Sequence, residues 1–161
     1  IDWMIYEAYA ANRDLGMNVR YYRSMEGDGK WHYALFDLDL SMNTDASFDA
    51  LMTGAWDIIP RKLIKNPTFQ DRFLKRLAYL LQNDLSQESV LAEYDRLIDQ
   101  IDEEVVLERA RWPKDLNKEW SDYAQDYKKQ ILKDRAGQLK QSIADYMGRP
   151  LSEIEAYFTQ D

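Results

Sequence analysis

Segment 61–161 most constrains the fold, because its apolar residues recur at the three-to-four-residue spacing of amphipathic helices. Asn66 followed by Pro67 is a helix cap with proline at the first helical position. Ser86 opens a second helix, which runs to the residue before Pro113, where proline stops it. The sequence therefore predicts several long helices that pack against one another.

Two further helices are expected toward the C-terminus. A third long helix covers roughly 117–147 and ends before Gly148. Ser152 with Glu155 forms a capping box, which predicts a last short helix.

The N-terminal part has a different pattern. Residues 2–12 predict a helix that ends near 14–16, where Gly16 can supply a left-handed cap. The runs 18–24 and 31–38 are rich in aromatic and β-branched residues and flank a turn that contains Asp28-Gly29, so they predict a β-hairpin.

These elements predict an α+β, mostly helical fold, in which an N-terminal helix and a β-hairpin pack on a bundle of long helices. We expect a single domain over 1–161. It comprises the first helix and hairpin in 1–40, a long loop with about one helical turn in 41–60, and the helical bundle in 61–161. A loop of that length inside a compact domain is often functional.

Composition narrows the function. The chain carries 29 acidic and 21 basic residues, a net charge of −8, which disfavours binding to nucleic acid phosphates. It has no cysteine, which excludes disulfides, thiolate zinc sites and cysteine nucleophiles. No apolar run has the length of a membrane span.

Two groups of carboxylates are candidates for chemistry. Asp14 follows the first helix, with Asn18 close behind, and Asp37 and Asp39 end the second expected strand. Strand alternation would place Asp37 and Asp39 on one face, where their charges repel unless a cation lies between them. Carboxylate and amide oxygens are the ligands of Mg²⁺ and Ca²⁺. Alternatively, Asp14 and Asp37 are a capping and a turn aspartate, and the strand face is simply hydrated.

Three other features have both a functional and a structural interpretation. His32 is the only histidine, and packing or a surface position explains it more simply than general-base catalysis. Basic residues between Arg61 and Arg76 could dock an acidic substrate, or form a solvated face that balances the eight acids and one base of 86–108. The aromatic residues of the hairpin could stack on sugars or pack the hairpin.

The motifs of the hairpin region resemble the CotH family of spore-coat-H-like atypical kinases. The resemblance rests on Asn18-Val19-Arg20-Tyr21-Tyr22-Arg23, Asp28-Gly29-Lys30-Trp31 and Leu35-Phe36-Asp37-Leu38-Asp39. The helix start at Asn66-Pro67-Thr68-Phe69 and the pair Arg111-Trp112 are similar to that family as well.

The resemblance implies a secreted, cell-surface or spore-coat bacterial kinase that transfers the γ-phosphoryl group of ATP to Ser or Thr of a protein substrate. By this resemblance Asp14 is the catalytic-loop aspartate, and Asn18 and Asp37 hold the Mg²⁺ of bound ATP. Asp39 is a further candidate ligand. Kinases also need a nucleotide-binding lysine and a covering lobe, which the family places before the catalytic loop. We therefore expect an upstream N-terminal lobe, and little or no transfer by this chain alone.

Two other hypotheses stay open. The chain could be a non-catalytic structural module, or a glycan- or protein-binding module, of a secreted or surface protein, with the aromatic hairpin as its contact surface. It could also be a domain stabilised by Ca²⁺.

Overall fold

The computed structural model describes residues 1–27, 29–54, 58–112 and 118–159. Within these ranges the chain forms eight α-helices, one two-stranded antiparallel sheet and a short 3-10 helix, which confirms the expected helix-dominated α+β class. The elements are α1 (Asp2–Ala10), β1 (Arg20–Arg23), β2 (Trp31–Ala34), α2 (Phe48–Gly54), α3 (Ile58–Leu63), α4 (Pro67–Gln82), α5 (Gln87–Arg111), α6 (Trp120–Ile131), α7 (Arg135–Met147), α8 (Leu151–Glu155) and η1 (Ala156–Phe158).

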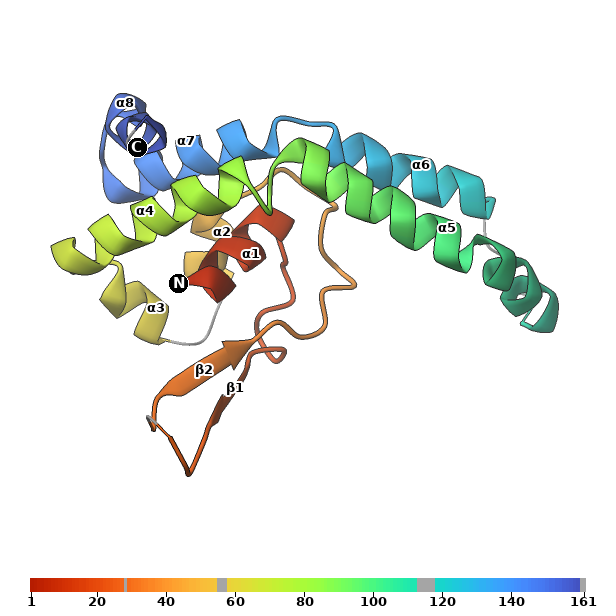
Figure 1. The fold of residues 1–161 in the computed structure, drawn as a ribbon, viewed down its shortest axis with the longest axis horizontal. Helices are drawn as coiled ribbons and strands as arrows, with labels where there is room; N and C mark the ends of the chain where they lie inside the picture. Colours follow the sequence, from red (N-terminus) through yellow and green to blue (C-terminus); the bar gives the residue numbers. More distant parts are fainter. Residues whose placement is uncertain (28, 55–57, 113–117, 160–161) are drawn as a thin grey trace.

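The hydrophobic core surrounds α1, which lies between α2, α4 and α7 (Figure 1). Six of its nine residues are buried, so this helix is covered on most of its circumference rather than along one stripe. Phe48 of α2, Phe73 of α4 and Ile143 of α7 are completely buried in the same core. Burial of this apolar surface is the main term that favours folding.

Helix α1 ends earlier than the sequence predicts. The left-handed cap is Ala11, with φ of 53°, and not Gly16. The Ala11 and Asn12 amides donate to the carbonyls of Ala8 and Glu7, as in a glycine-capped helix end. Asp14 therefore lies in the loop beyond the helix.

The hairpin is confirmed, but both strands are shorter than predicted. Tyr21 pairs with Tyr33 and Tyr22 with His32 in antiparallel register. The sheet packs on α1 through Trp3 and Tyr33, whose ring centres are 4.8 Å apart. The turn aspartate Asp28 lies outside the described residues.

The expected loop over 41–60 contains more helix than one turn, because α2 and the start of α3 both fall within it. The hydroxyl of Ser142 accepts a hydrogen bond of 2.9 Å from the Phe48 amide at the beginning of α2. This helix start thus has a distant partner, a side chain 94 positions away. It also has a local cap, because the Ser47 hydroxyl accepts from the Ala50 amide at 3.1 Å.

The helix starts at Asn66 and Ser86 are confirmed. Asn66 accepts from the Phe69 amide at 3.1 Å, and Ser86 accepts from the Ser89 amide at 3.2 Å. Helix α5 ends at Arg111, and the expected stop signal Pro113 lies outside the described residues.

The single helix predicted over 117–147 is wrong. It is two helices, α6 and α7, because Asp134 caps a new helix by accepting from the Gly137 amide at 2.8 Å. The expected capping box is also wrong. Pro150 is the N-cap of α8, so Ser152 lies inside the helix.

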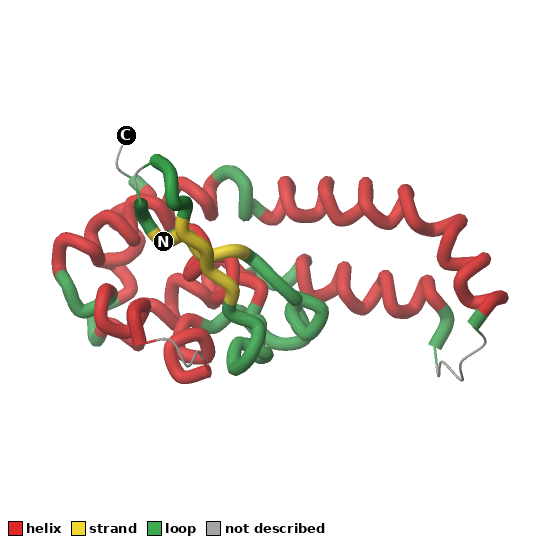
Figure 2. Tube along the Cα trace, turned by 90° about the horizontal axis from the view of Figure 1, so that it is seen from below, coloured by secondary structure: helices red, strands yellow, loops and turns green. Residues whose placement is uncertain are grey.

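Helices α5 and α6 form a long arm that extends away from the core (Figures 1 and 2). We call residues 87–131 the arm, apart from 113–117, which lie outside the described ranges. None of the residues of α5 is buried. In the described ranges, none of the helices combines the length and hydrophobicity that crossing a lipid bilayer requires.

Candidate functional site

A chain of hydrogen bonds leads from the core to Asp14. The Asn12 amide group donates to Oε2 of Glu7 at 2.9 Å, and Oδ1 of Asn12 accepts from the Asp14 backbone amide at 3.0 Å. The Asn18 side chain then donates to Oδ2 of Asp14 at 2.8 Å. The structure therefore brings together Asp14 and Asn18, two of the residues predicted from the sequence.

Glu7 is the buried end of this chain. It is 1% exposed, as is Asn12. Burial raises the pKa of Glu7, and the hydrogen bond from Asn12 offsets part of that rise. The indole N–H of Trp3 lowers the pKa as well, but its geometry falls short of a hydrogen bond. Glu7 thus fixes Asn12, and Asn12 fixes the backbone at Asp14.

Asp37 and Asp39 do not lie on the strand, contrary to prediction. Strand β2 ends at Ala34, and the argument from strand alternation no longer applies. Asp37 has φ of 57°, in the left-handed region that aspartate tolerates better than most residues. Both carboxylates are exposed.

Two segments, one with Asp14 and Asn18 and the other with Asp37 and Asp39, both connect the end of α1 to the hairpin. Segment 12–19 connects the end of α1 to β1. Segment 35–42 leaves β2 and returns to the end of α1, where the Met42 amide donates to the Ala10 carbonyl at 2.6 Å. At the hairpin, the Arg20 guanidinium lies 4.6 Å from the centre of the Phe36 ring. The two segments therefore start and end close to each other, at α1 and at the hairpin.

Helix α7 holds the returning segment in place. Arg135 is 1% exposed and donates to the carbonyls of Tyr9 and Thr44, the second at 2.9 Å. Gln138 accepts from the Ala46 amide at 3.1 Å. A cation next to the last carbonyls of α1 also interacts favourably with the helix dipole. The returning segment is thus fixed to α1 and to α7.

The donor atoms available for a cation are oxygens. The side-chain N–H of Asn18 donates to Asp14, so Oδ1 of Asn18 is not part of that hydrogen bond. Asp37 and Asp39 make no ion pair with another described residue. Within the described ranges, no three residues of the types His, Cys, Asp and Glu are grouped so that they could hold a metal ion.

The other sequence candidates lie apart from this chain of hydrogen bonds. His32 is exposed and stacks on Tyr22, with ring centres 5.4 Å apart, as a surface packing residue does. Tyr21 contacts Trp31 edge-on at 5.4 Å. Both rings remain largely exposed, at 57% and 60%.

Comparison with known protein families shows which family this chain belongs to. Residues 1–139 match the family described as CotH kinase protein. The chain belongs to this family. The match includes α1, the hairpin, the returning segment and the arm. The comparisons with curated proteins and with solved structures gave no match.

Sequence reasoning missed Glu7 and the residues of α7 that support the site. Glu7 could have been noticed, because it is an acid inside the otherwise apolar run Trp3-Met4-Ile5-Tyr6-Glu7-Ala8-Tyr9. Acids are almost never fully buried without a partner, so such a position calls for a nearby donor. Arg135 gives no comparable signal, since it lies in a polar stretch.

Proposed function

We propose that this chain supplies the catalytic loop of a CotH-type protein kinase, which transfers the γ-phosphoryl group of ATP to Ser or Thr of a protein substrate. The observation that carries the proposal is the family match over 1–139, which includes the whole segment from Glu7 to Met42. The hydrogen bond between Asn18 and Asp14 supports it. A secreted, cell-surface or spore-coat location in a bacterium is part of the same proposal.

Asp14 orients the acceptor hydroxyl and takes its proton. Its Oδ2 is held by Asn18 and its backbone amide by Asn12, so the side chain has a fixed position. Oδ1 makes no hydrogen bond to another described residue and is the atom that would accept the proton. Positioning accounts for much of catalysis in phosphoryl transfer, because the protein forms few new bonds with the transferred group.

Asn18 and Asp37 would hold Mg²⁺, with Asp39 as a further ligand. One amide oxygen and two carboxylates fit Mg²⁺, which is bound by one or two carboxylates, water and the phosphates of the nucleotide. They are fewer than the six to eight oxygens that Ca²⁺ takes. When bound, the ion neutralises the charge that develops on the phosphates.

Phosphoryl transfer also requires a lysine at the phosphates and a lobe that covers the nucleotide. The family resemblance places both before the catalytic loop. The test therefore uses the longest natural protein that contains this sequence. Radiolabelled phosphate transfer from ATP is compared for the natural protein, Asp14→Asn and Asp37→Ala. We expect both variants to lose at least about 100-fold in rate, because Asp14→Asn removes the catalytic base and Asp37→Ala removes a ligand of the ion that neutralises the phosphates. Equal rates in all three would refute the proposal.

A second candidate function is a binding module that uses the hairpin. The exposed Tyr21 and Trp31 rings favour it, because aromatic faces of this size suit stacking on sugars or peptides. Titration with oligosaccharides, followed by tryptophan fluorescence, tests it. Binding that Trp31→Ala abolishes and Asp37→Ala leaves intact would favour the module, whereas no binding would contradict it.

A further inference from the structure

The distal half of the arm has an apolar surface that no other described element covers. Ile101 and Leu107 of this surface are 42% and 64% exposed. A groove of about 420 Å³ lies along this surface. Exposed apolar surface of this kind often marks a contact with another protein.

This part of the arm is also acidic. Between Ser86 and Glu108 there are eight acids and one base. Glu104 and Glu108 line the groove beside Leu107, and neither forms an ion pair with another described residue. Arg111 is the one base in the described lining, so the groove is apolar with a net negative charge and favours a partner with apolar side chains and positive charge.

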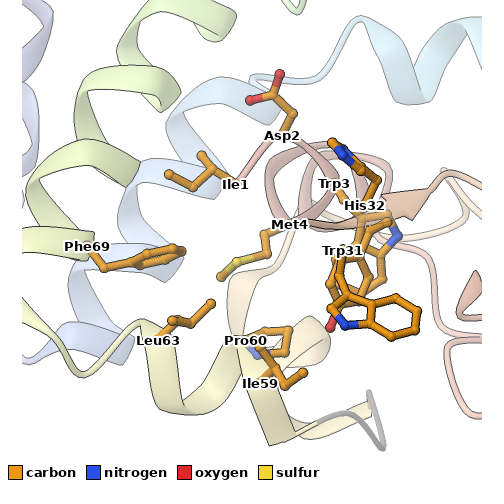
Figure 3. Close-up of a pocket in the computed structure, with 11 residues that line it drawn as sticks. Ile1, Asp2, Trp3, Met4, Trp31, His32, Ile59, Pro60, Leu63 and Phe69 are labelled. Atoms are coloured by element: carbon orange, nitrogen blue, oxygen red, sulfur yellow. The ribbon is translucent and has the colours of Figure 1, made fainter. Parts of the chain in front are cut away.

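The opposite end of the molecule has the matching chemistry. A pocket of about 290 Å³ lies between α1, the hairpin, α3 and α4 (Figure 3). Its lining includes Trp31, Ile59 and Leu63, which are 60%, 50% and 41% exposed. Trp31 comes from β2, and Ile59 and Leu63 come from α3, so the pocket is bordered by both elements (Figure 3).

Exposed bases lie on α3 and α4, which border this pocket, and the acid in its lining, Asp2, is paired with Arg76. Lys62, Lys65 and Arg72 are exposed, and the described residues provide none of them with an ion-pair partner. Over residues 58–72 there are four bases and one acid, Asp71, which is paired with Lys75. We call α3 and the start of α4 the basic face. Its net charge is positive, whereas that of the whole chain is negative.

We propose that two copies of this chain associate head to tail, with the acidic apolar groove of one arm on the basic face and its apolar pocket in the next copy. The two surfaces lie at opposite ends of the molecule, so one copy cannot join its own (Figure 1). The apolar groups supply affinity, and the opposite charges supply orientation and specificity. Because the contact joins two different surfaces, the assembly stays open or closes into a ring. The proposal does not depend on phosphoryl transfer.

Sedimentation of the full chain from roughly 1 μM to 1 mM, the range of weak interfaces, tests the proposal. Two charge-reversal variants are compared with the natural chain: Glu104→Lys/Glu108→Lys on the arm and Lys62→Glu/Lys65→Glu on the basic face. Asp84→Lys/Glu88→Lys is the matched control for the arm variant, because it changes the same charge at exposed residues outside the groove. Circular dichroism checks that every variant is folded.

We expect the average mass of the natural chain to rise with concentration at about 0.1 M salt. It should fall toward the monomer at about 1 M, where the screening length is about 3 Å. Each reversal should weaken association at least tenfold, and the control should not. A mixture of the two reversal variants should associate again, because each then meets opposite charge. A monomer at every concentration, an association that both reversals leave unchanged, or a mixture that stays monomeric would overturn the proposal.

Discussion

Replacement of Arg135 by methionine should destabilise the protein strongly, because this side chain fixes α7 to α1 and to segment 35–46. Arg135→Met keeps the length of the side chain but removes the donors to the Tyr9 and Thr44 carbonyls. Each buried acceptor left without a donor costs about 1–3 kcal/mol. Part of this is offset, since burial of the guanidinium is itself unfavourable and lowers the pKa of Arg135. We expect a net loss of about 3 kcal/mol.

Urea unfolding followed by circular dichroism measures this loss, and in a chain of this size it corresponds to a fall in Tm of about 6–12 °C. Arg96→Met is the matched control, because Arg96 forms an exposed ion pair with Glu93 on α5. Such a pair contributes about 0.5 kcal/mol or less. Amide exchange at Met42 and Ala46 should also speed up in Arg135→Met. Equal stability of the two variants would refute the account of Arg135.

Two further predictions concern stability. Because burial raises the folded-state pKa of Glu7, its contribution to stability should be full below the unfolded value and should fall as pH rises through the raised folded value. Glu7→Gln should therefore lessen the decline of unfolding free energy above about pH 4, measured by denaturation at each pH. An unchanged slope would show that burial of Glu7 is not the cause. Asn66→Ala removes the cap of α4 and should cost about 1 kcal/mol in the same assay, while no loss would show that the cap is not needed.

The sequence could predict the elements whose ends are set locally. Asn66 and Ser86 each cap a helix through a hydrogen bond to a residue three positions away, so the signal lies within a few letters. The same holds for the hairpin, where the aromatic residues that pair across the strands are visible in the sequence.

Elements whose ends depend on distant residues could not be predicted. The break before α7 interrupts a periodic pattern. Its cap, Asp134, is local, but the next residue, Arg135, turns inward to the Tyr9 carbonyl 126 positions away. The start of α2 likewise combines a local cap, Ser47, with a distant partner, Ser142. The early end of α1 at Ala11 lacks the usual glycine, so nothing in the residue type announces it.

In the candidate site, too, local contacts could be predicted from the sequence and distant contacts could not. Asn18 and Asp14 are four positions apart, and their hydrogen bond follows from a local turn. The place of Asp37 was predicted from strand alternation, which fails because the strand ends at Ala34. What joins segment 35–42 to the site is its return to α1 at Met42, a tertiary contact.

In the proposed function, Asp14, Asn18 and Asp37 act together on one bound Mg²⁺–ATP. Calorimetric titration of Mg²⁺–ATP into the longest natural protein that contains this sequence tests it most directly, with Asp37→Ala and Asn18→Ala beside the natural protein. The account predicts binding heat that requires Mg²⁺, and at least about tenfold weaker affinity in each variant, equivalent to about 1.4 kcal/mol. Affinity that is the same in all three proteins, or binding that does not need Mg²⁺, would contradict it.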